Sequence, residues 1–460
     1  MAFSSSRGAS GLRIFYGFLF FSLAVAGTVV VLLFFELGKP VVKVDKVGDY
    51  IGKKGMISFS VHDAKSGLRS VIVSCVQGEV KKVLHSETFA RTAYTGAIGP
   101  RDYSQEVTFD TKTEGFSEGP MTITVEARDY SMWGWFSGNR TVVVKEVKVD
   151  TEAPKVQLLH GENYISPGGT GIAIYRLNDP DSTHGVTING RLHPGFVLAE
   201  ENTEIYISYF ALPYDAEKID GLAVKAIDRA GNETNVSFST ILQKVAPKKD
   251  SIAVSDGFLQ EKMPEFQHHY PEMKGDLMEM YLFVNNDVRD RNNAKISDLC
   301  RTPLPQRMWR GSFSRMSGSS RAGFAEHRTY YYKDKAIDNQ VHLGMDIAST
   351  QRAEVFAANT GQVVFAGYLG IYGNLVLVDH GQGIFSLYSH LSQINVSSGD
   401  KVDQKSVLGL TGTSGMAGGD HLHFSMLVNG IFVTPKEWWD QHWVDVNIED
   451  PIKELKNIKP

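Results

Sequence analysis

The longest uncharged stretch of this chain lies close to its start. Residues 14–35 are mostly large apolar side chains without a single charge, and at about 1.5 Å per residue a helix of that length crosses the hydrocarbon core of a bilayer. A cleaved secretory signal is the alternative, with Ala24-Val-Ala26 as its small-residue site. The apolar run continues beyond that site, which favours an uncleaved anchor. The sequence therefore predicts a transmembrane helix over 14–37.

The charges around this segment predict its orientation. Arg7 and Arg13 precede it with no acidic residue near them. By the positive-inside rule, residues 1–13 stay in the cytoplasm and everything after about residue 37 lies on the other side of the membrane. The whole chain carries a formal net charge of −5 and no cluster of basic residues. Nothing in this pattern indicates nucleic-acid binding.

Residues 40–245 predict β-structure. Apolar and polar residues alternate in short stretches separated by Gly, Pro, Asp and Asn, which is the pattern of antiparallel strands. A weak repeat relates 123–129 to 223–232, and the acidic joint Val149-Asp-Thr-Glu-Ala-Pro154 resembles the linkers between tandem bacterial immunoglobulin-like domains. The strand spacing and the size fit a pair of β-sandwiches. We expect two immunoglobulin-like domains, over 40–150 and 151–245.

Two tryptophans stand near the end of the first of these domains. Trp133 and Trp135 occur in the sequence Ser-Met-Trp-Gly-Trp-Phe. Contact with a glycan is one interpretation. Aromatic packing at the edge of a sandwich is the other, and it is the favoured one.

The pattern changes after residue 245. Apolar residues in 246–311 recur at three and four positions, which is the helical period and predicts a connector of short helices. Alternation returns beyond residue 350 and predicts five strands, over 354–366, 374–380, 383–390, 406–411 and 421–428. The predicted fold class is thus mainly β, with an antiparallel β domain over 312–445 and a C-terminal tail over 446–460.

Five side chains of this last domain form a pattern that suits a metal. His421 and His423 alternate with a leucine in a predicted strand, so both imidazoles point to the same face. His342-Leu-Gly-Met-Asp346 and the separate His390 precede them. Neutral imidazoles and a carboxylate are ordinary zinc ligands, and a catalytic zinc takes three protein ligands and leaves a fourth position for water. The surplus of histidine over what coordination needs indicates catalysis as well as metal binding.

In these residues and in the sequence between them, the chain resembles the lysostaphin-type zinc metallopeptidases. Those are peptidoglycan endopeptidases with the pattern H-x-x-x-D, then a lone His, then H-x-H. The resemblance extends over 324–437, although Phe324-Ala-Glu-His-Arg328 stands where many relatives have Phe-Gly-x-x-Arg. It implies one zinc ion bound by His342, Asp346 and His423. It also implies that His390 and His421 are catalytic residues outside the metal's coordination.

The resemblance also implies a function and a location. Zinc would supply hydroxide at neutral pH and polarise the scissile carbonyl, while the two histidines divide base, acid and oxyanion-stabilising roles. The chain is predicted to be a membrane-anchored zinc metalloendopeptidase that hydrolyses peptide bonds in peptidoglycan stems or cross-links. It would lie in the cytoplasmic (inner) membrane, facing the periplasm or the outside of the cell, with division or wall-synthesis proteins as partners of its immunoglobulin-like domains. The alternative is a non-catalytic regulator that binds peptidoglycan or an amidase through the same groove.

The segment before the first proposed ligand predicts a wall for this site. Residues 301–341 are rich in Arg, Ser, Gly and Tyr and lack a clear strand pattern. We expect them to fold over the cleft as a mobile wall or lid, with Tyr330 in contact with substrate. Asn374 and Tyr388, in stretches that resemble the same family, are the other predicted substrate-binding residues.

Overall fold

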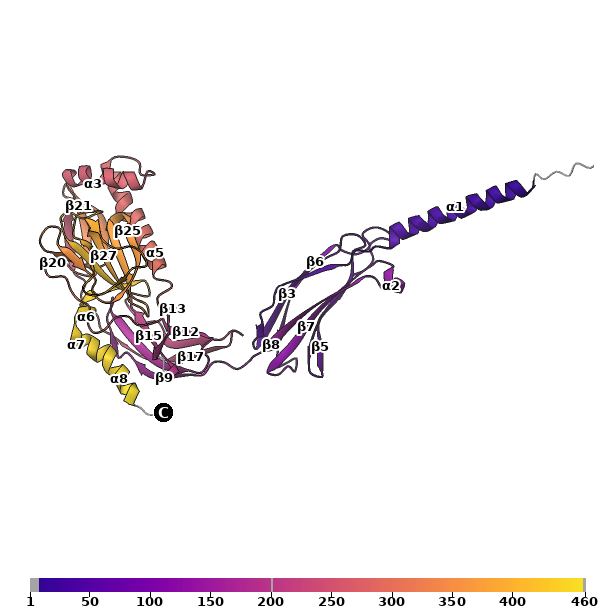
Figure 1. Cartoon of the computed structure of the whole chain (residues 1–460), viewed down its shortest axis with the longest axis horizontal. Coiled ribbons are helices and arrows are strands. Elements are labelled where there is room, and N and C mark those ends of the chain that lie inside the picture. The colour runs from indigo at the N-terminus through magenta and orange to yellow at the C-terminus, as the bar shows by residue number, and fades with distance from the viewer. Residues whose placement is uncertain (1–7, 200–201, 458–460) are drawn as a thin grey trace, which may run out of the picture. The chain divides into compact units, whose positions relative to one another are not determined.

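The computed structural model describes residues 8–199 and 202–457. It divides into two compact units: one extends to Ala153 and includes 228–232, and the other comprises 154–227 and 233 onward. Figure 1 shows the order of the helices and strands along the chain. Residues 1–7 of the predicted cytoplasmic segment and 458–460 of the predicted tail lie outside the described residues.

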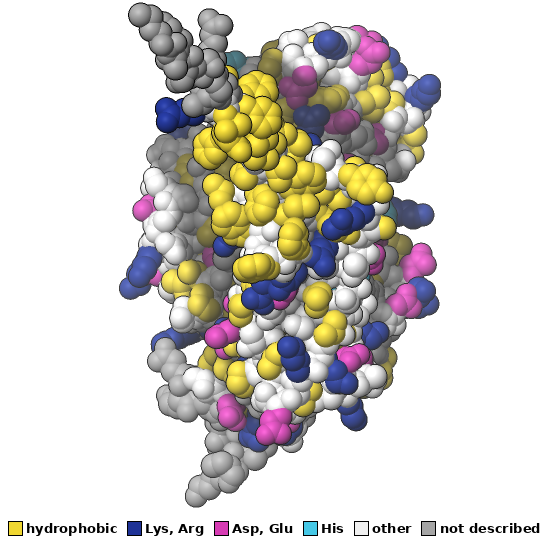
Figure 2. Space-filling model, turned by 90° about the vertical axis from the view of Figure 1, so that its right-hand side faces the viewer, with side chains coloured by type: hydrophobic (Ala, Val, Ile, Leu, Met, Phe, Trp, Pro, Cys, Tyr) yellow, Lys and Arg dark blue, Asp and Glu magenta, His cyan; other side chains and the backbone are white. Residues whose placement is uncertain are grey.

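The first helix corresponds to the predicted membrane segment. α1 (Gly8–Phe34) is 27 residues long. Within it, Leu12–Phe34 is long and apolar enough to cross a membrane, a property that an anchor shares with a secretory signal. Its large apolar side chains are exposed instead of packed into a core, and they form much of the hydrophobic surface in Figure 2.

The rest of the first unit is built from two sheets that face one another across one core. Their strand orders are β1-β3-β6 and β2-β8-β7-β4-β5. The bounds are Val41–Lys46 (β1), Tyr50–Ile51 (β2), Lys54–His62 (β3), Leu68–Gln77 (β4), Val80–Thr88 (β5), Asp102–Asp110 (β6), Gly119–Asp129 (β7) and Arg140–Val149 (β8). Every second residue of β7 is buried, so the alternation in the sequence corresponds to one core-facing side. A short turn, α2 (Trp133–Phe136), joins β7 to β8.

Two further sheets with a core of their own open the second unit. Their orders are β14-β15-β11-β9 and β13-β12-β16-β17, and β10 pairs with β18 beside them. The bounds are Val156–Gly161 (β9), Tyr164–Ile165 (β10), Thr170–Leu177 (β11), Thr183–Ile188 (β12), Arg191–Pro194 (β13), Phe196–Ala199 (β14), Asn202–Ala211 (β15), Leu222–Ile227 (β16), Glu233–Ser237 (β17) and Ile241–Leu242 (β18). Many of their buried apolar residues form one cluster, which is the core of this second sandwich.

The predicted helical connector is present and begins with a strand. Its elements are β19 (Lys249–Ala253), α3 (Asp256–His269), α4 (Leu277–Phe283), the π-helical turn η1 (Val284–Val288) and α5 (Arg289–Leu299). Ser255 caps α3 by accepting a hydrogen bond from Phe258 N, and Asp276 forms a capping box with Glu279 at the start of α4. These caps determine where α3 and α4 begin, which the spacing of the apolar residues alone does not determine.

The C-terminal domain is centred on one large antiparallel sheet. Its strand order is β20-β23-β31-β27-β26-β25-β29, with β32 paired to β31, and two smaller sheets flank it: β19-β21-β22 and β24-β30-β28. The bounds are Ser319–Ala322 (β20), Glu326–Tyr332 (β21), Lys335–His342 (β22), Met345–Ala348 (β23), Glu354–Phe356 (β24), Gly361–Tyr368 (β25), Asn374–Asp379 (β26), Ile384–Leu391 (β27), Gln393–Ile394 (β28), Lys401–Val402 (β29), Val407–Leu410 (β30), Leu422–Val428 (β31) and Ile431–Val433 (β32). A 3₁₀ turn, η2 (Gly370–Tyr372), precedes β26.

The second sandwich and the C-terminal domain share a core. Ile172 and Tyr209 from β11 and β15 belong to the same buried apolar cluster as Trp309 and Trp438. The chain then ends in α6 (Pro435–Trp439), α7 (Gln441–Val444), the π-helical turn η3 (Asp445–Glu449) and α8 (Asp450–Asn457). Residues 446–457 of the predicted tail are therefore helical, and Ile448 is fully buried in this core.

A partly buried carboxyl group at this junction predicts a pH-dependent stability. Glu437 of α6 accepts a hydrogen bond from Thr170 N of β11 (2.9 Å), and burial raises the pKa of Glu437 to about 8. Because the folded state holds a proton that the unfolded state releases near the ordinary value of 4.5, stability should be full below that value and fall as pH rises toward 8. We expect Glu437→Gln to remove this loss, amounting to a few kcal/mol. Thermal unfolding across this pH range tests it, with the exposed Glu354→Gln as the control; equal pH profiles for wild type and Glu437→Gln would contradict it.

Candidate metal centre and catalytic site

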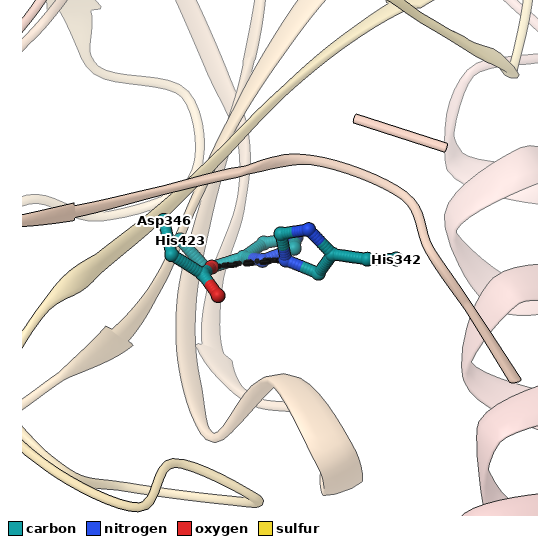
Figure 3. Close-up of side chains that lie close together, drawn as sticks. All are labelled: His342, Asp346 and His423. Atoms are coloured by element: carbon teal, nitrogen blue, oxygen red, sulfur yellow. Dashed lines mark hydrogen bonds and ion pairs between the residues drawn. The ribbon is translucent and has the colours of Figure 1, made fainter. Parts of the chain in front are cut away.

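Three potential metal ligands converge at the edge where β22, β23 and β31 meet. β23 and β31 are antiparallel neighbours, and their register places Asp346 directly opposite His423. His342, the last residue of β22, completes the group (Figure 3). His342 Nε2 lies 3.0 Å from Asp346 Oδ1 and 2.9 Å from His423 Nδ1, and His423 Nδ1 lies 2.9 Å from Asp346 Oδ1. All three side chains are buried.

The hydrogen bonds on the far side of each imidazole decide which nitrogen carries a proton. His342 Nδ1 faces Gly323 O at 2.8 Å, so this nitrogen donates and Nε2 keeps its lone pair. Ser425 Oγ donates to Leu343 O and lies 3.1 Å from His423 Nε2. His423 Nε2 therefore donates to that hydroxyl, and its Nδ1 keeps its lone pair.

The donor atoms of His342, Asp346 and His423 are chemically suited to a zinc ion. Two imidazole lone pairs and one carboxylate oxygen face one another with no proton between them, an arrangement that a cation stabilises. Zinc bonds of about 2.0 to 2.1 Å in tetrahedral geometry separate ligands by about 3.3 Å, close to the spacings observed here. His342, Asp346 and His423 would thus hold zinc and leave its fourth position open.

Gly344 allows the two ligand strands to approach this closely. A Cβ atom at Gly344 would lie 2.5 Å from His423 Nε2 and 2.7 Å from Phe424 O. Neither atom can move without displacing a ligand or β31. The glycine inside His342-Leu-Gly-Met-Asp346 is therefore required by the packing of the site.

Arg328 supports the carboxylate ligand from outside. Its Nη2 lies 3.2 Å from Asp346 Oδ2, the oxygen that does not face the histidines. Burial opposes ionisation of Asp346, but its interactions with His342, His421 and His423 together outweigh that effect and lower the pKa of Asp346 well below its usual range. An outer partner of this kind fixes the orientation of a ligand. Arg328 and Tyr330 are two residues apart in β21. This spacing places both side chains on one face of the strand and is the sequence signal that could have indicated Arg328.

The two remaining histidines lie beside the metal ligands. His390 donates from Nδ1 to Ser414 O (2.9 Å) and His421 from Nδ1 to Gly419 O (2.7 Å). Each therefore has an unprotonated Nε2 in its neutral form, and His421 Nε2 lies 3.6 Å from Asp346 Oδ1. The two ring centres are 4.9 Å apart, so both can act on one reacting group.

The surroundings of these two histidines shift their proton affinities in opposite directions. Burial lowers the pKa of His390 well below its usual range, and the neighbouring His421 and His423 add to the effect. Burial also acts to lower the pKa of His421, but the Asp346 carboxylate outweighs it and raises that pKa. His390 also has φ +63°, a left-handed conformation that a non-glycine residue adopts at some energetic cost. Its position in the site is thus imposed by the surrounding structure.

The sequence profile of Peptidase family M23 matches residues 340–435, which carry all five of these side chains. The C-terminal domain is an M23 metallopeptidase domain. The profile covers the part of the chain from the end of β22 to the start of α6. It leaves out the connector helices and both sandwiches.

Curated proteins similar to a segment of this chain include two endopeptidases and an activator of hydrolases. DD-carboxypeptidase/endopeptidase Mpg of Neisseria meningitidis is 38% identical over 96 residues, which are 21% of this chain and 22% of that protein. Peptidoglycan DD-endopeptidase ShyA of Vibrio cholerae is 36% identical over 89 residues, 19% of this chain and 21% of that protein. Murein hydrolase activator EnvC of Escherichia coli is 37% identical over 95 residues, 21% of this chain and 23% of that protein. The chain thus spans about a fifth of the length of these relatives.

A cavity of about 700 Å³ opens from the M23 site toward the connector. Its lining includes the metal ligands, both further histidines and the predicted wall, of which Arg321, Ala322 and Arg328 are part. Arg328 lies in a three-stranded sheet, which forms because β19 pairs in parallel with β21 of the β21–β22 hairpin. Arg321 and Ala322 lie in β20 at the edge of the large sheet. Residues of the predicted wall therefore line the cavity, and they lie in strands that the sequence pattern did not indicate. The mobility of this wall stays a prediction.

The three predicted substrate-binding residues lie in different places. Tyr330 lines the cavity, with its ring edge-on to Tyr281. Asn374 is directed away from the cavity: its Nδ2 donates to Leu391 O (2.9 Å) and so joins β26 to the end of β27. Tyr388 is fully buried, and its hydroxyl accepts hydrogen bonds from Ala358 N (2.6 Å) and from a serine hydroxyl. Asn374 and Tyr388 are not among the residues that line the cavity.

A helix outside the matched segment fixes the loop that orients His390. Lys262 of α3 is buried, and its Nζ donates to Thr413 O (2.5 Å). Glu265, one turn later, accepts from Gly415 N (3.2 Å). The carbonyl of Ser414, between these two contacts, is the partner of His390 Nδ1. The connector helix therefore holds the M23 loop from behind.

Replacing this lysine should slow the reaction while leaving the metal bound. In Lys262→Met the loop loses one of its two hydrogen bonds to α3, so the carbonyl that orients His390 is held less firmly. We therefore expect kcat to fall by about ten- to a hundredfold, as small misplacements of catalytic groups do. KM and zinc content should stay near wild type. Steady-state kinetics and metal analysis check this, with Lys295→Met, an exposed lysine of α5, as the control. A change in KM alone would show that α3 acts on substrate binding instead.

Proposed function

We propose that this protein is a membrane-anchored zinc endopeptidase that hydrolyses peptide bonds in peptidoglycan stems or cross-links. The observation that carries the proposal is the convergence of three metal-ligand lone pairs with two further histidines around one cavity. The name of the curated relative ShyA, a peptidoglycan DD-endopeptidase, supports peptidoglycan as the substrate. These relatives match only the C-terminal domain, so the activity of the full-length protein is our extension of that similarity.

The residues of the site suit attack of water on a peptide carbonyl. When bound, zinc would activate water and polarise the scissile carbonyl. His390 and His421 would accept and return protons at Nε2, because Nδ1 of each is occupied by a backbone carbonyl. As the protonated form of either histidine is cationic, it would also stabilise the developing oxyanion. Arg328 would keep Asp346 in its ligating orientation during the reaction.

Arginines of the cavity suit the carboxylates of a peptide, and Asp250, Glu261 and Asp346 line the same cavity. Arg289, Arg321 and Arg328 line it, and peptide carboxylates are recognised by guanidinium groups through paired hydrogen bonds. Tyr330 would pack against the apolar part of the peptide. We further propose that Asn374 and Tyr388 assist binding indirectly, by fixing β26 and β27 below the site.

The N-terminal half would place this site at the membrane. We propose that α1 is an uncleaved single span of the cytoplasmic (inner) membrane and that the residues after it face the periplasm or the outside of the cell. The two sandwiches would be immunoglobulin-like domains and would bind division or wall-synthesis proteins. Their two-sheet architecture and separate cores support this reading.

Digestion of defined muropeptides tests the proposed activity. The zinc-loaded full-length protein should convert cross-linked muropeptides to smaller products, and mass spectrometry should assign every cut to one type of peptide bond. A non-catalytic regulator is the second candidate, because EnvC, a hydrolase activator by name, matches the same domain. If the zinc-loaded protein binds peptidoglycan but leaves every muropeptide intact, and stimulates an amidase instead, the regulator is correct.

A further inference from the structure

The end of α1 is fixed to the first domain by hydrogen bonds. Glu36, two residues after the helix, accepts from Ser66 Oγ (2.7 Å) at Oε1. Asn139 Nδ2 donates to the carbonyls of Glu36 (3.1 Å) and Gly38 (2.8 Å). Lys65 Nζ donates to Leu32 O (2.9 Å) and so supplies the cation that the last turn of α1 lacks. The helix therefore continues into a fixed joint instead of a free linker.

An aromatic loop, residues 132–137, lies directly beside this joint. Met132 N donates to Phe34 O (2.9 Å), and the ring of Trp133 is edge-on to Phe35 at 6.2 Å between centres. The large side chains of the loop face outward: Trp133 is 50% exposed, Trp135 96% and Phe136 67%. Figure 2 shows hydrophobic side chains gathered at this end of the molecule, with Lys and Arg side chains around them.

The backbone of the loop holds these rings outside the sandwich. Gly134, Trp135 and Phe136 have φ of +63°, +57° and +69°, a left-handed turn that bulky residues rarely adopt. Arg69 Nη1 donates to Phe136 O (3.0 Å) and Ser137 Oγ donates to Gly134 O. Strain that is kept in place in this way is typical of a segment with a binding role. Packing at the sandwich edge, the role favoured by the sequence, does not account for rings that remain exposed.

We propose that the aromatic loop is a second membrane contact, which inserts Trp133, Trp135 and Phe136 into the headgroup region of the bilayer that α1 crosses. Tryptophan prefers this region because one side of its ring is apolar and its N–H reaches water. The loop starts where the span ends, so it meets headgroups when α1 is in place. Arg69 behind the loop and Lys65 at the helix end suit the phosphates. Together with the fixed joint, the contact holds the first domain in one orientation on the membrane.

This proposal rests on α1 being a membrane anchor, and the test separates the two. The full-length protein is reconstituted into bilayers of phosphatidylethanolamine and phosphatidylglycerol with or without lipids brominated close to the headgroup, which quench tryptophan on contact. Of the six tryptophans in the chain, Trp133 and Trp135 are the two in the loop, and the others belong to the C-terminal domain. We expect brominated lipids to remove most of the emission of these two residues. Trp133→Phe/Trp135→Phe should lose the quenchable part, and the matched control Trp443→Phe should keep it.

Three outcomes would count against the aromatic loop as a membrane contact or against the anchor. Protein that resists alkaline extraction but shows no quenching keeps the anchor and overturns the second contact. Protein that is extracted overturns the anchor on which the second contact rests. Emission that responds to soluble glycan strands but not to brominated lipids assigns the loop to glycan binding and overturns the membrane contact. Muropeptide cleavage is measured on the same samples, so failure of the proposed activity is recorded separately.

Discussion

His342→Ala, Asp346→Ala and His423→Ala should each lose zinc and peptidase activity together. The three donor atoms lie within 3.0 Å of one another, and each would supply one lone pair to the ion. Because only three protein side chains would bind the zinc, losing one of them removes a large part of the zinc-binding free energy. Activity should fall to the background of the zinc-free protein.

Metal analysis of the purified variants and digestion of muropeptides measure both effects on the same samples. His327→Ala is a matched control, because His327 is an exposed histidine of the neighbouring β21. Added zinc should restore part of the activity in a variant whose affinity is only reduced. A variant that retains one zinc per chain and full activity would remove its residue from the ligand set.

The strands that carry the site were predictable because their sequence pattern is local. The predictions over 374–380, 383–390 and 421–428 correspond to β26, β27 and β31, with ends that differ by a residue or so. These strands are mostly apolar and bounded by Gly, Asp or Asn, and the His-x-His spacing fixes which side faces the metal. The prediction of one strand over 354–366 was wrong in that the structure has two, β24 and β25, separated by a turn.

The wall of the cavity was not predictable from local signals. The β21–β22 hairpin turns at Lys333 and Asp334, which both have positive φ. A two-residue turn of this kind is normally marked by Asn-Gly or Asp-Gly, and neither is present here. β21 also needs β19, more than seventy residues earlier in the chain, as its parallel partner. Pairing over such a separation leaves no periodic trace in either segment.

The supporting residues of the site were missed for a related reason. The sequence singled out the five metal and catalytic candidates by residue type, but Lys262, Arg328 and Ser414 act through contacts with other segments. Lys262 lies 151 residues from Thr413, to which it donates, and Ser414 contributes only a backbone carbonyl to His390. A backbone group has no signature in a sequence. Residues that fix the geometry of a site are thus harder to predict than residues that perform its chemistry.

His390→Ala and His421→Ala should keep zinc and lose turnover. Neither side chain supplies one of the three converging lone pairs; each instead presents Nε2 beside them, with Nδ1 bound to a carbonyl. Their loss removes proton transfer and charge stabilisation, for which we expect kcat to fall by about 10² to 10⁴. Because His390 has a left-handed backbone, His390→Asn is a useful companion, since asparagine tolerates that conformation better than alanine.

The double variant distinguishes one catalytic unit from two independent contributions. With ring centres 4.9 Å apart, both histidines would act on one transition state, so the second loss should add little to the first. Zinc content and muropeptide turnover of the single and double variants provide the test. Fully additive losses would mean that the two histidines act in separate steps. If His421→Ala loses its metal while His423→Ala keeps it, the roles within the His-x-His pair are reversed, and the ligand set must include the more exposed of the two.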